Sequence, residues 1–236
     1  MLTHQRRQVA ATMRRLYERN LTTASGGNIS ARTSADRILL TASKFDKAEL
    51  SASQICILTL DNRNLTPDLT PSIEANMHLE IYRRYPGIQA VVHAHPVTAS
   101  AFCASGTPVN CRFTAEAYAI IGEPVYAPYA RMGTTELAKY VAEAVATGCC
   151  VLMENHGILA TGDNLAQAVD RLEILEIAAQ TTLILQQLQD SRELTPVQLA
   201  QLDAMMGRLS SNSSRVTITD VGQMQSKGHK KHGRRD

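Results

Sequence analysis

The segment from Ile88 to His95 is the strongest constraint on the fold. It reads Ile-Gln-Ala-Val-Val-His-Ala-His and follows Pro86-Gly87, a pair that ends helices. β-Branched runs of this kind are typical of buried strands. An amphipathic helix is expected just before it, because polar and apolar residues that share one helical face recur there. These residues are Glu74, Met77, His78, Ile81, Tyr82 and Tyr85.

The remaining elements follow from hydrophobic periodicity and turn residues. We expect an amphipathic first helix, strands at 29–32, 37–41, 55–60, 125–127 and 150–153, a helix starting at Thr70-Pro71, and helices at 99–104, 114–121, 136–147, 165–188 and 196–209. Helices and strands mix without regular strand–helix–strand units. The pattern therefore predicts an α/β sandwich whose sheet is at least partly antiparallel.

One domain over residues 1–208 is expected, followed by a flexible basic tail over 209–236. The tail begins rich in Ser and Asn, and its last ten residues hold five basic groups and one acid. Such a composition is typical of a mobile terminus. The chain has no Trp, and no aromatic residue stands among the basic residues of the tail, so we expect no nucleic-acid partner.

The chain carries no sign of a membrane or secreted protein. No apolar run approaches the roughly 18 residues that a membrane span needs. The first twenty residues include five arginines and lack the apolar block of a secretory signal. The five cysteines are odd in number and contain no Cys-x-x-Cys pair, which disfavours a disulfide framework and a thiolate zinc site. We therefore expect a cytoplasmic protein without a membrane partner.

His93 and His95 are the first candidates for chemistry. They lie two residues apart on the predicted strand, so both imidazoles leave the same side of the sheet, with Cβ atoms about 7 Å apart. That spacing can bring two ring nitrogens within about 2.1 Å of one cation. The alternative is that each histidine is a hydrogen-bonded core residue. His78 has that interpretation here, because it sits among apolar helix positions.

His156 and Glu74 are candidates to complete a metal site. His156 stands where a strand runs into a glycine turn, and Glu74 is expected in the first turn of its helix, beside apolar Met77 and Ile81. A partly buried carboxylate needs a partner, which a cation or a proton can supply. Three imidazoles and one carboxylate suit Zn²⁺, with Mn²⁺, Fe²⁺ and Co²⁺ as alternatives.

A second group of residues is suited to a phosphate. The turn Ser25-Gly26-Gly27-Asn28 can present backbone N–H groups to an anion. Thr41, Ser43 and Lys44 follow a predicted strand, and Ser72 stands near a helix start. Hydroxyl and ammonium groups of this kind are the donors that hold phosphates.

Taken together, these residues resemble the class II aldolase and adducin-head family along residues 5 to about 205. Five blocks in order carry the resemblance: Ser25-Gly26-Gly27-Asn28, Leu40-Thr41-Ala42-Ser43, Pro71-Ser72-Ile73-Glu74, His93-Ala94-His95-Pro96 and Asn155-His156-Gly157. The fold that the resemblance implies is a three-layer α/β/α sandwich around a mainly antiparallel sheet. It also implies a homotetramer with active sites at subunit interfaces.

The resemblance assigns roles to these residues. His93, His95 and His156 would be the zinc ligands, and Glu74 a ligand that doubles as acid or base. Substrate phosphate would be held by Asn28, Thr41, Ser43 and Ser72. Members of the family cleave, epimerise, dehydrate or decarboxylate small sugar phosphates. The implied activity is an aldolase that cleaves a small ketose phosphate to dihydroxyacetone phosphate and an aldehyde through a metal-stabilised enediolate.

The chain also departs from the family's aldolases. Ile73 replaces a serine that usually precedes the glutamate, and Lys44 replaces a common glycine, so we expect Lys44 to bind the phosphate. No tyrosine follows Tyr140 to act as the usual proton donor, which leaves Glu116 and Tyr118 as alternatives. A 4-epimerase, dehydratase or sugar-acid phosphate decarboxylase on the same metal site remains open. A non-catalytic, adducin-like binding domain is the alternative from another class.

Overall fold

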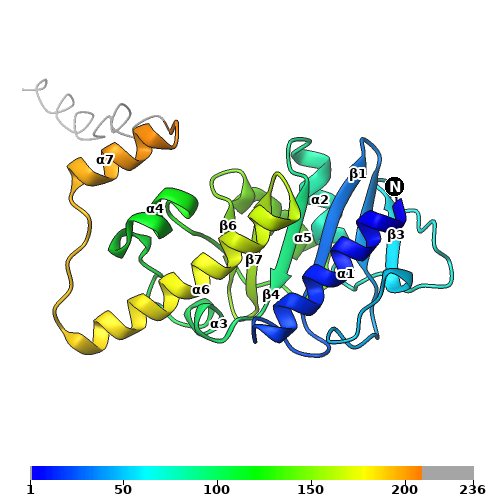
Figure 1. Ribbon diagram of the computed structural model, residues 1–236, viewed down its shortest axis with the longest axis horizontal. Helices are drawn as coiled ribbons and strands as arrows, with labels where there is room; N and C mark the ends of the chain where they lie inside the picture. The colour runs from blue at the N-terminus through cyan, green and yellow to red at the C-terminus, as the bar shows by residue number, and fades with distance from the viewer. Residues whose placement is uncertain (1, 209–236) are drawn as a thin grey trace, which may run out of the picture.

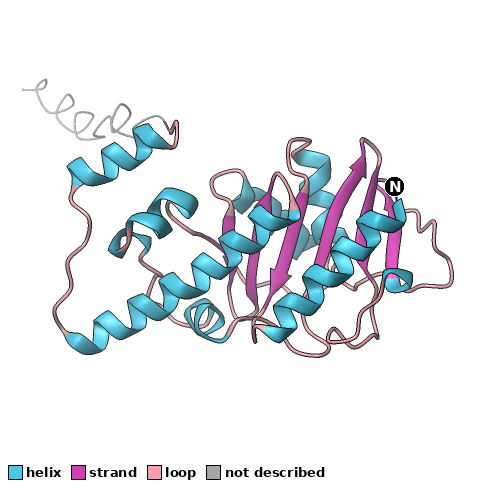
Figure 2. Ribbon diagram, viewed as in Figure 1, coloured by secondary structure: helices cyan, strands magenta, loops and turns pink. Residues whose placement is uncertain are grey.

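The computed structural model describes residues 2–208, so the tail expected at 209–236 lies outside the described residues. A seven-stranded sheet, in the order β3-β2-β1-β4-β7-β6-β5, forms its centre (Figure 1, Figure 2). The strands are β1 (Asn28–Ser34), β2 (Arg37–Thr41), β3 (Ile55–Thr59), β4 (Ala90–Ala94), β5 (Val125–Ala127), β6 (Cys150–Met153) and β7 (Gly157–Gly162). All neighbours pair antiparallel except β5 and β6, which run parallel. The sheet is mixed and mainly antiparallel, as predicted.

Helices cover both faces of this sheet. On one face lie α1 (Leu2–Glu18), α3 (Val97–Cys103), α4 (Ala115–Ile121) and α6 (Leu165–Leu188), and on the other lie α2 (Ala75–Arg84) and α5 (Thr135–Val145). Two short 3₁₀ helices, η1 (Ala52–Gln54) and η2 (Cys111–Phe113), connect elements. Figure 1 shows α1 and α6 crossing in front of the strands. The three-layer α/β/α sandwich is confirmed.

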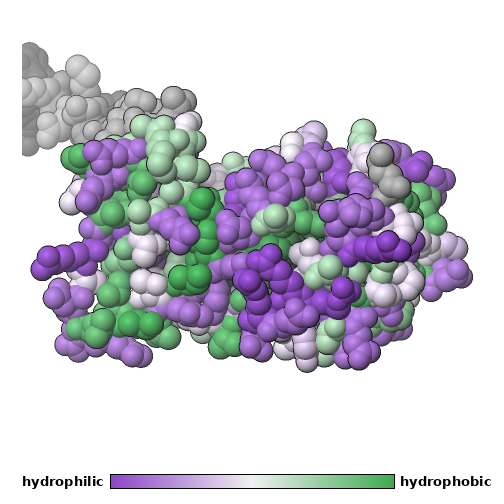
Figure 3. Space-filling view, viewed as in Figure 1, coloured by the Kyte–Doolittle hydropathy of each residue, from purple (hydrophilic) through white to green (hydrophobic). Residues whose placement is uncertain are grey.

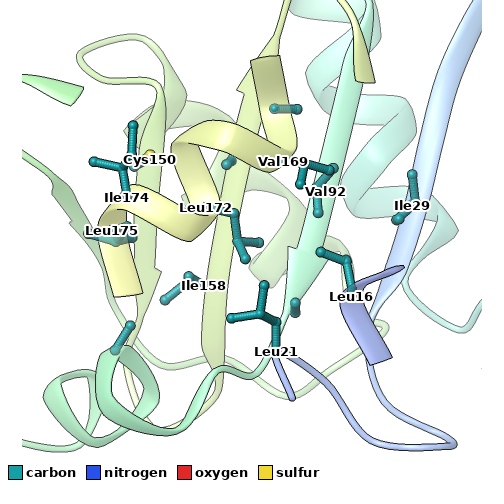
Figure 4. Close-up of a cluster of buried hydrophobic side chains, with 14 of the residues drawn as sticks. Leu16, Leu21, Ile29, Val92, Cys150, Ile158, Val169, Leu172, Ile174 and Leu175 are labelled. Carbon is teal, nitrogen blue, oxygen red and sulfur yellow. The ribbon is translucent and has the colours of Figure 1, made fainter. Parts of the chain in front are cut away.

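The two cores meet at β4, the central strand. Val92 packs with Leu16 and Leu172 in the core that Figure 4 shows, whereas the preceding residue, Val91, packs with Tyr82 in the opposite core. Side chains alternate between the faces of a strand, so a strand covered on both sides must be apolar at successive positions. Burial of all five residues of β4 explains the apolar run in the sequence.

Two expectations about the elements were wrong. Strand β7 was missed, because only Ile-Leu-Ala-Thr separates its two glycines, and so short a run shows neither alternation nor the long β-branched pattern of β4. The helix expected from Thr70-Pro71 begins only at Ala75. Its first residues pair with another segment instead: the Thr70 carbonyl accepts from the Ser43 N–H at 2.8 Å, and Pro71 bridges Ala42.

The long helix α6 has two different halves. Its predicted apolar stripe of Ala168, Leu172, Leu175 and Ala179 is buried against the sheet. Its C-terminal half instead exposes Ile177, Leu183, Ile184 and Leu188, and apolar side chains are visible at that end of the molecule in Figure 3. An extended segment leads on to α7 (Pro196–Met205). Among residues 2–208, no helix combines the length and apolar character needed to cross a membrane.

Candidate active site

His93 and His95 stand at one end of β4 and face each other. His93 is fully buried within β4, and His95 is the first residue after the strand. Their ring centroids lie 4.6 Å apart in an edge-to-face arrangement. The Nδ1–H of His93 donates to the Ile158 carbonyl oxygen of β7 at 2.9 Å, which leaves Nε2 as the atom that faces the site.

His156 joins this pair from the turn between β6 and β7. Asn155 holds the turn in a left-handed conformation with φ of 51°, which asparagine tolerates better than most residues, and the His156 N–H donates to the Met153 carbonyl. The His156 ring centroid lies 5.0 Å from that of His93 and 5.7 Å from that of His95. One ring nitrogen from each of the three histidines falls within 4.8 Å of the others.

Glu74 brings a carboxylate to the three imidazoles. It lies just before α2 at the N-cap position, not in the first turn as expected, and its carboxylate does not cap the helix. Glu74 Oε1 lies 3.1 Å from His156 Nε2, and Glu74 Oε2 lies 3.2 Å from His93 Nε2. The carboxylate is nearly fully buried. The structure thus brings together Glu74, His93, His95 and His156, which the sequence analysis had proposed as one site.

The groups of this cluster perturb one another's protonation. Burial raises the pKa of Glu74, but the positive charge of His93, the nearby ring of His156 and the hydrogen bond from Asn28 outweigh it and hold that pKa far below its ordinary value. Burial lowers the pKa of His93, and the Glu74 carboxylate more than reverses this. Burial, followed by the charges of its two neighbouring histidines, lowers the pKa of His95 to about 3. His95 is therefore a neutral imidazole at pH 7.

The donor set fits a divalent cation. Within residues 2–208, His93 Nε2 and Glu74 Oε1 are buried atoms without a hydrogen-bond partner, although each faces another member of the cluster. In a tetrahedral site with bonds of about 2.1 Å, ligand atoms lie roughly 3.4 Å apart, which resembles the spacing of the Glu74 oxygens from the two imidazoles. Imidazole and carboxylate ligands without thiolate suit Zn²⁺ and other borderline divalent ions.

A cavity of about 330 Å³ opens beside the cluster. Its wall consists of residues 25–28 before β1, residues 42–44 and Lys47 after β2, residues 72–74 before α2, and Met132, His95 and His156. Backbone N–H groups, hydroxyl groups and two lysines thus border the space next to the histidines. A wall of this composition suits a small, polar, anionic ligand.

Three of the expected phosphate ligands line this cavity, and the two serines among them have local partners. The Ser43 hydroxyl donates to the Pro71 carbonyl at 2.9 Å, and the Ser72 hydroxyl accepts from the Glu74 N–H at 3.3 Å. Lys44 is exposed and has a φ of 67°. That left-handed conformation favours glycine, which agrees with the glycine common there in the family the sequence resembles.

Thr41 does not reach the cavity. It is fully buried in the sheet, and its hydroxyl oxygen accepts a hydrogen bond from the Ile29 N–H at 3.2 Å. Its position at the end of β2 places the side chain against the neighbouring strand β1. Thr41 therefore supports the strand that leads to Asn28, and we leave it out of the candidate phosphate site.

Lys47 is a cavity residue that the sequence analysis did not select. Its side chain is 3% exposed, and its ammonium group donates to the Ala42 carbonyl at 3.0 Å. Burial lowers the pKa of this lysine. A buried ammonium at the wall of a polar cavity is a candidate for contact with an anion. The signal in the sequence is weak, because Lys47 stands in a polar loop among other charged residues.

Asn28 and His78 form a second unexpected feature. The side chain of Asn28 donates from Nδ2 to Glu74 Oε2 at 2.7 Å, and its Oδ1 lies 2.5 Å from His78 Nε2. Asn28 lines the cavity, yet both ends of its amide are engaged behind the carboxylate. His78 is buried as expected, but in contact with polar groups. His78 lies one helical turn after Glu74, and that spacing could have indicated that its side chain lies near the polar groups around Glu74.

The two alternatives for a second acid or base lie elsewhere. Neither Glu116 nor Tyr118 borders the cavity beside the histidines. Glu116 is exposed in the first turn of α4. The Tyr118 hydroxyl donates to Asp203 at 3.2 Å, on the side of α4 that contacts α7. Among residues 2–208, Glu74 is thus the acidic residue that contacts the histidines.

Known proteins are similar to this chain in both sequence and fold. Residues 7–183 match the family model of the class II aldolase and adducin N-terminal domain. An L-fuculose phosphate aldolase of Methanococcus maripaludis is 34% identical over 175 residues, 74% of this chain and 94% of the relative. A 3-oxo-tetronate 4-phosphate decarboxylase of Haemophilus influenzae is 32% identical over 194 residues, 80% of this chain and 91% of the relative. The solved structure of YgbL from Escherichia coli superposes with a TM-score of 0.80 at 27% identity, covering 85% of this chain and 98% of YgbL. The chain belongs to the class II aldolase and adducin N-terminal domain family.

Proposed function

We propose that this protein is a metal-dependent aldolase that cleaves a small ketose phosphate into dihydroxyacetone phosphate and an aldehyde. The proposal is carried by the convergence of three imidazoles and one carboxylate at the wall of a polar cavity that also holds two lysines. Similarity to an L-fuculose phosphate aldolase supports this reaction. The small volume of the cavity is in keeping with a small substrate.

His93, His95, His156 and Glu74 are the proposed metal ligands. We propose Zn²⁺ as the cation, with Mn²⁺, Fe²⁺ and Co²⁺ as alternatives that accept the same ligand types. A cation held there would supply positive charge to stabilise the negative charge that develops on substrate oxygens when the carbon–carbon bond breaks. The neutral state of His95 and the hydrogen bond that orients His93 favour binding through these rings.

Glu74 is the proposed acid and base. Its carboxylate is ionised at neutral pH, so it can take a proton from a substrate carbon or hydroxyl that enters the cavity and return it later. Burial keeps bulk water from competing for that proton. Because this carboxylate packs against the histidines, we propose that the reacting end of the substrate lies beside it.

The other side of the cavity is the proposed phosphate site. Ser43, Lys44 and Ser72 are retained from the sequence analysis, and Lys47 is added as a buried cation. Ile73 occupies the place of a serine common in the family. Its side chain is apolar and 65% exposed, so it offers no hydrogen-bond donor to a phosphate. Two lysines can compensate for that donor with charge.

Decarboxylation is the second candidate reaction. It is favoured by the similarity to the Haemophilus influenzae decarboxylase, which extends over more of this chain than the similarity to the aldolase. Loss of CO₂ from a 3-oxo acid leaves the same kind of negative charge next to a carbonyl as aldol cleavage does. Epimerase and dehydratase reactions use that chemistry too, and an adducin-like binding role requires no reaction at all.

A substrate screen with two separate readouts tests the proposal. Metal-loaded protein is incubated with four-, five- and six-carbon ketose phosphates, and dihydroxyacetone phosphate is detected by coupled oxidation of NADH. Parallel reactions with 3-oxo sugar-acid phosphates are assayed for CO₂. Dihydroxyacetone phosphate formed from a ketose phosphate supports the aldolase, and CO₂ released from a 3-oxo sugar-acid phosphate supports the decarboxylase. Bound metal without either product would contradict both and leave an epimerase, a dehydratase or a binding domain.

Assembly, compartment and domain organisation complete the proposal. We propose a homotetramer, for which the exposed apolar residues of α6 offer an interface, and light scattering of the purified protein tests it. We propose the cytoplasm as the compartment, since all five cysteines are free thiols. A single catalytic domain over residues 1–208 with a basic tail at 209–236 remains our proposal for the organisation of the chain.

A further inference from the structure

A chain of buried hydrogen bonds leads from the interior of the protein to Glu74. His78 lies on α2 with no exposed surface, and both of its ring nitrogens have polar partners. Nδ1 lies 2.6 Å from the Ser30 hydroxyl oxygen, and Nε2 lies 2.5 Å from Asn28 Oδ1. Ser30 in turn lies 2.9 Å from the Tyr82 hydroxyl. Asn28 completes the chain at Glu74 Oε2.

The chemistry of the partners determines which atom donates in each of these hydrogen bonds. An ionised carboxylate only accepts hydrogen bonds, so Asn28 must point its NH₂ group at Glu74 and its oxygen at His78. The oxygen only accepts, so His78 must carry its proton on Nε2. His78 Nδ1 is then an acceptor, and the Ser30 hydroxyl donates to it, which leaves the Tyr82 hydroxyl to donate to Ser30.

The same arrangement prevents the Asn28 amide from turning over. In the reversed amide, the NH₂ group would face the Nε2–H of His78, and the amide oxygen would face the carboxylate of Glu74. Both contacts are repulsive, and both lie between side chains that are nearly fully buried, where an unpaired polar group costs most. Burial also lowers the pKa of His78 to about 3, so the ring stays neutral at pH 7 and keeps a lone pair for Ser30.

We propose that His78 is a positioning residue: its Nε2–H tautomer fixes the Asn28 amide, and that amide holds Glu74 Oε2 so that Oε1 stays turned towards His156. This inference rests on the proposed role of Glu74 at the metal and the substrate. It changes the role of Asn28, because both polar atoms of its side chain serve Glu74 and His78, and the phosphate site is left to the serines and lysines.

The tautomer of His78 is the direct test, and it requires no activity. In ¹⁵N-labelled, metal-free protein, nuclear magnetic resonance distinguishes a protonated ring nitrogen from an unprotonated one, and the His78→Gln spectrum identifies the His78 signals. We expect a neutral ring with the proton on Nε2. A proton on Nδ1, or on both nitrogens, would overturn the inference whatever reaction the protein catalyses.

Two substitutions test the effect on Glu74. His78→Leu removes the donor to Asn28 and should lower Zn²⁺ affinity and turnover by about 10- to 100-fold, with the Michaelis constant nearly unchanged. His78→Gln can still donate to the Asn28 oxygen and should recover most of the loss, while His4→Gln, at an exposed position, is the control. Equal defects in the Leu and Gln variants, or no defect in the folded Leu variant, would contradict positioning.

The measurements separate this inference from the proposed function. Zn²⁺ affinity, obtained by competition with a chromophoric chelator, reports on Glu74 even if the wild-type protein shows no lyase activity. Absence of lyase activity with the expected tautomer and affinities would refute the aldolase and keep the role of His78. Lyase activity that His78→Leu leaves unchanged would keep the aldolase and refute the role of His78.

Discussion

Gly157 lies directly against the ring of His95, from the start of the neighbouring strand β7. A Cβ atom at Gly157 would stand 2.5 Å from His95 Cδ2 and 2.9 Å from the Ala94 carbonyl oxygen. Both distances are shorter than real carbon contacts, so a side chain here would have to displace the imidazole or the backbone of β4. The glycine after His156 thus gives His95 the space to join the cluster.

Gly157→Ala should therefore weaken metal binding. The added methyl group moves His95 away from His93 and His156, and we expect metal affinity to fall by about 10- to 100-fold, together with a loss of roughly 1–3 kcal/mol in the free energy of unfolding from overpacking. Titration with Zn²⁺ and urea unfolding measure the two effects. Gly106→Ala is the matched control, because a Cβ there meets no atom within 4 Å. An unchanged affinity in Gly157→Ala would contradict this explanation.

The ligand assignment predicts different consequences for His95 and Glu74. His95→Ala should lose metal and activity together, because it removes one of the three imidazoles. Glu74→Gln keeps the size of the side chain but loses its charge and cannot act as a base. In excess Zn²⁺ it should retain most of the metal while turnover falls roughly 10²- to 10⁴-fold, and its Zn²⁺ affinity should fall at least as far as that of His78→Leu. Elemental analysis of each variant beside its turnover number checks this. Full activity in either variant would overturn the assignment.

Lys47 and Lys44 should differ in their effect on substrate binding. A hydrogen bond from a buried ammonium to an anion contributes about 1.5–3 kcal/mol, so Lys47→Met should raise the Michaelis constant for a phosphorylated substrate by roughly 10- to 150-fold. Lys44 is exposed, and charges in that setting contribute about 0.2–1 kcal/mol, or less than roughly fivefold, which added salt should abolish. Lys44→Gly is the suitable variant, because φ there is 67°.

Kinetics at low and high ionic strength distinguish the two lysines. The effect of Lys47→Met should persist in salt, whereas that of Lys44→Gly should vanish. If Lys44→Gly raises the Michaelis constant more than Lys47→Met does at both salt concentrations, Lys44 is the main phosphate ligand, as the sequence first suggested, and our assignment to the buried lysine is wrong.

Much of the fold was predictable because its strongest signals are local. The apolar run of β4 and the stripe of α6 record burial directly in the order of residues. Strand β7 was not predictable in the same way, since only Ile-Leu-Ala-Thr lies between its two glycines, and it becomes a strand by pairing with β4 and β6. The residues Thr70-Pro71 resemble a helix start, and only their pairing with residues 42–43 shows otherwise.

The residues of the site likewise differ in how far the local sequence predicts them. His93 and His95 are close in sequence, so spacing alone indicated a pair. His156 and Glu74 were indicated only by their placement, at a strand end and near a helix start, and the resemblance to a known family then assigned them as ligands. Lys47 was missed because a lysine in a polar loop is normally exposed, whereas the fold buries this one. His78 was set aside as a core residue, and it is one. What the sequence could not supply is that its neighbours in the core are the polar groups of Asn28 and Ser30.

His78 also predicts how stability depends on pH. The pKa of its imidazole is about 3 in the folded protein and about 6.5 in an unfolded chain. Above pH 6.5 the ring is neutral in both states, and it has no effect. Below pH 6.5 the unfolded chain takes up a proton that the folded protein does not, so the free energy of unfolding falls by up to about 1.4 kcal/mol per pH unit until the folded ring also titrates near pH 3.

Replacing His78 by glutamine should remove that part of the pH dependence. In metal-free protein, urea unfolding at pH 7.5 and pH 4.5 should show a loss of stability that is smaller in His78→Gln than in wild type by roughly 2–3 kcal/mol, because glutamine does not titrate. Carboxylates and the other histidines titrate alike in both proteins and cancel in the difference. His4→Gln, at an exposed position, should follow wild type. If His78→Gln and wild type lose the same free energy between the two pH values, the buried imidazole is not held neutral, and the direction of the hydrogen-bond chain to Glu74 loses its basis.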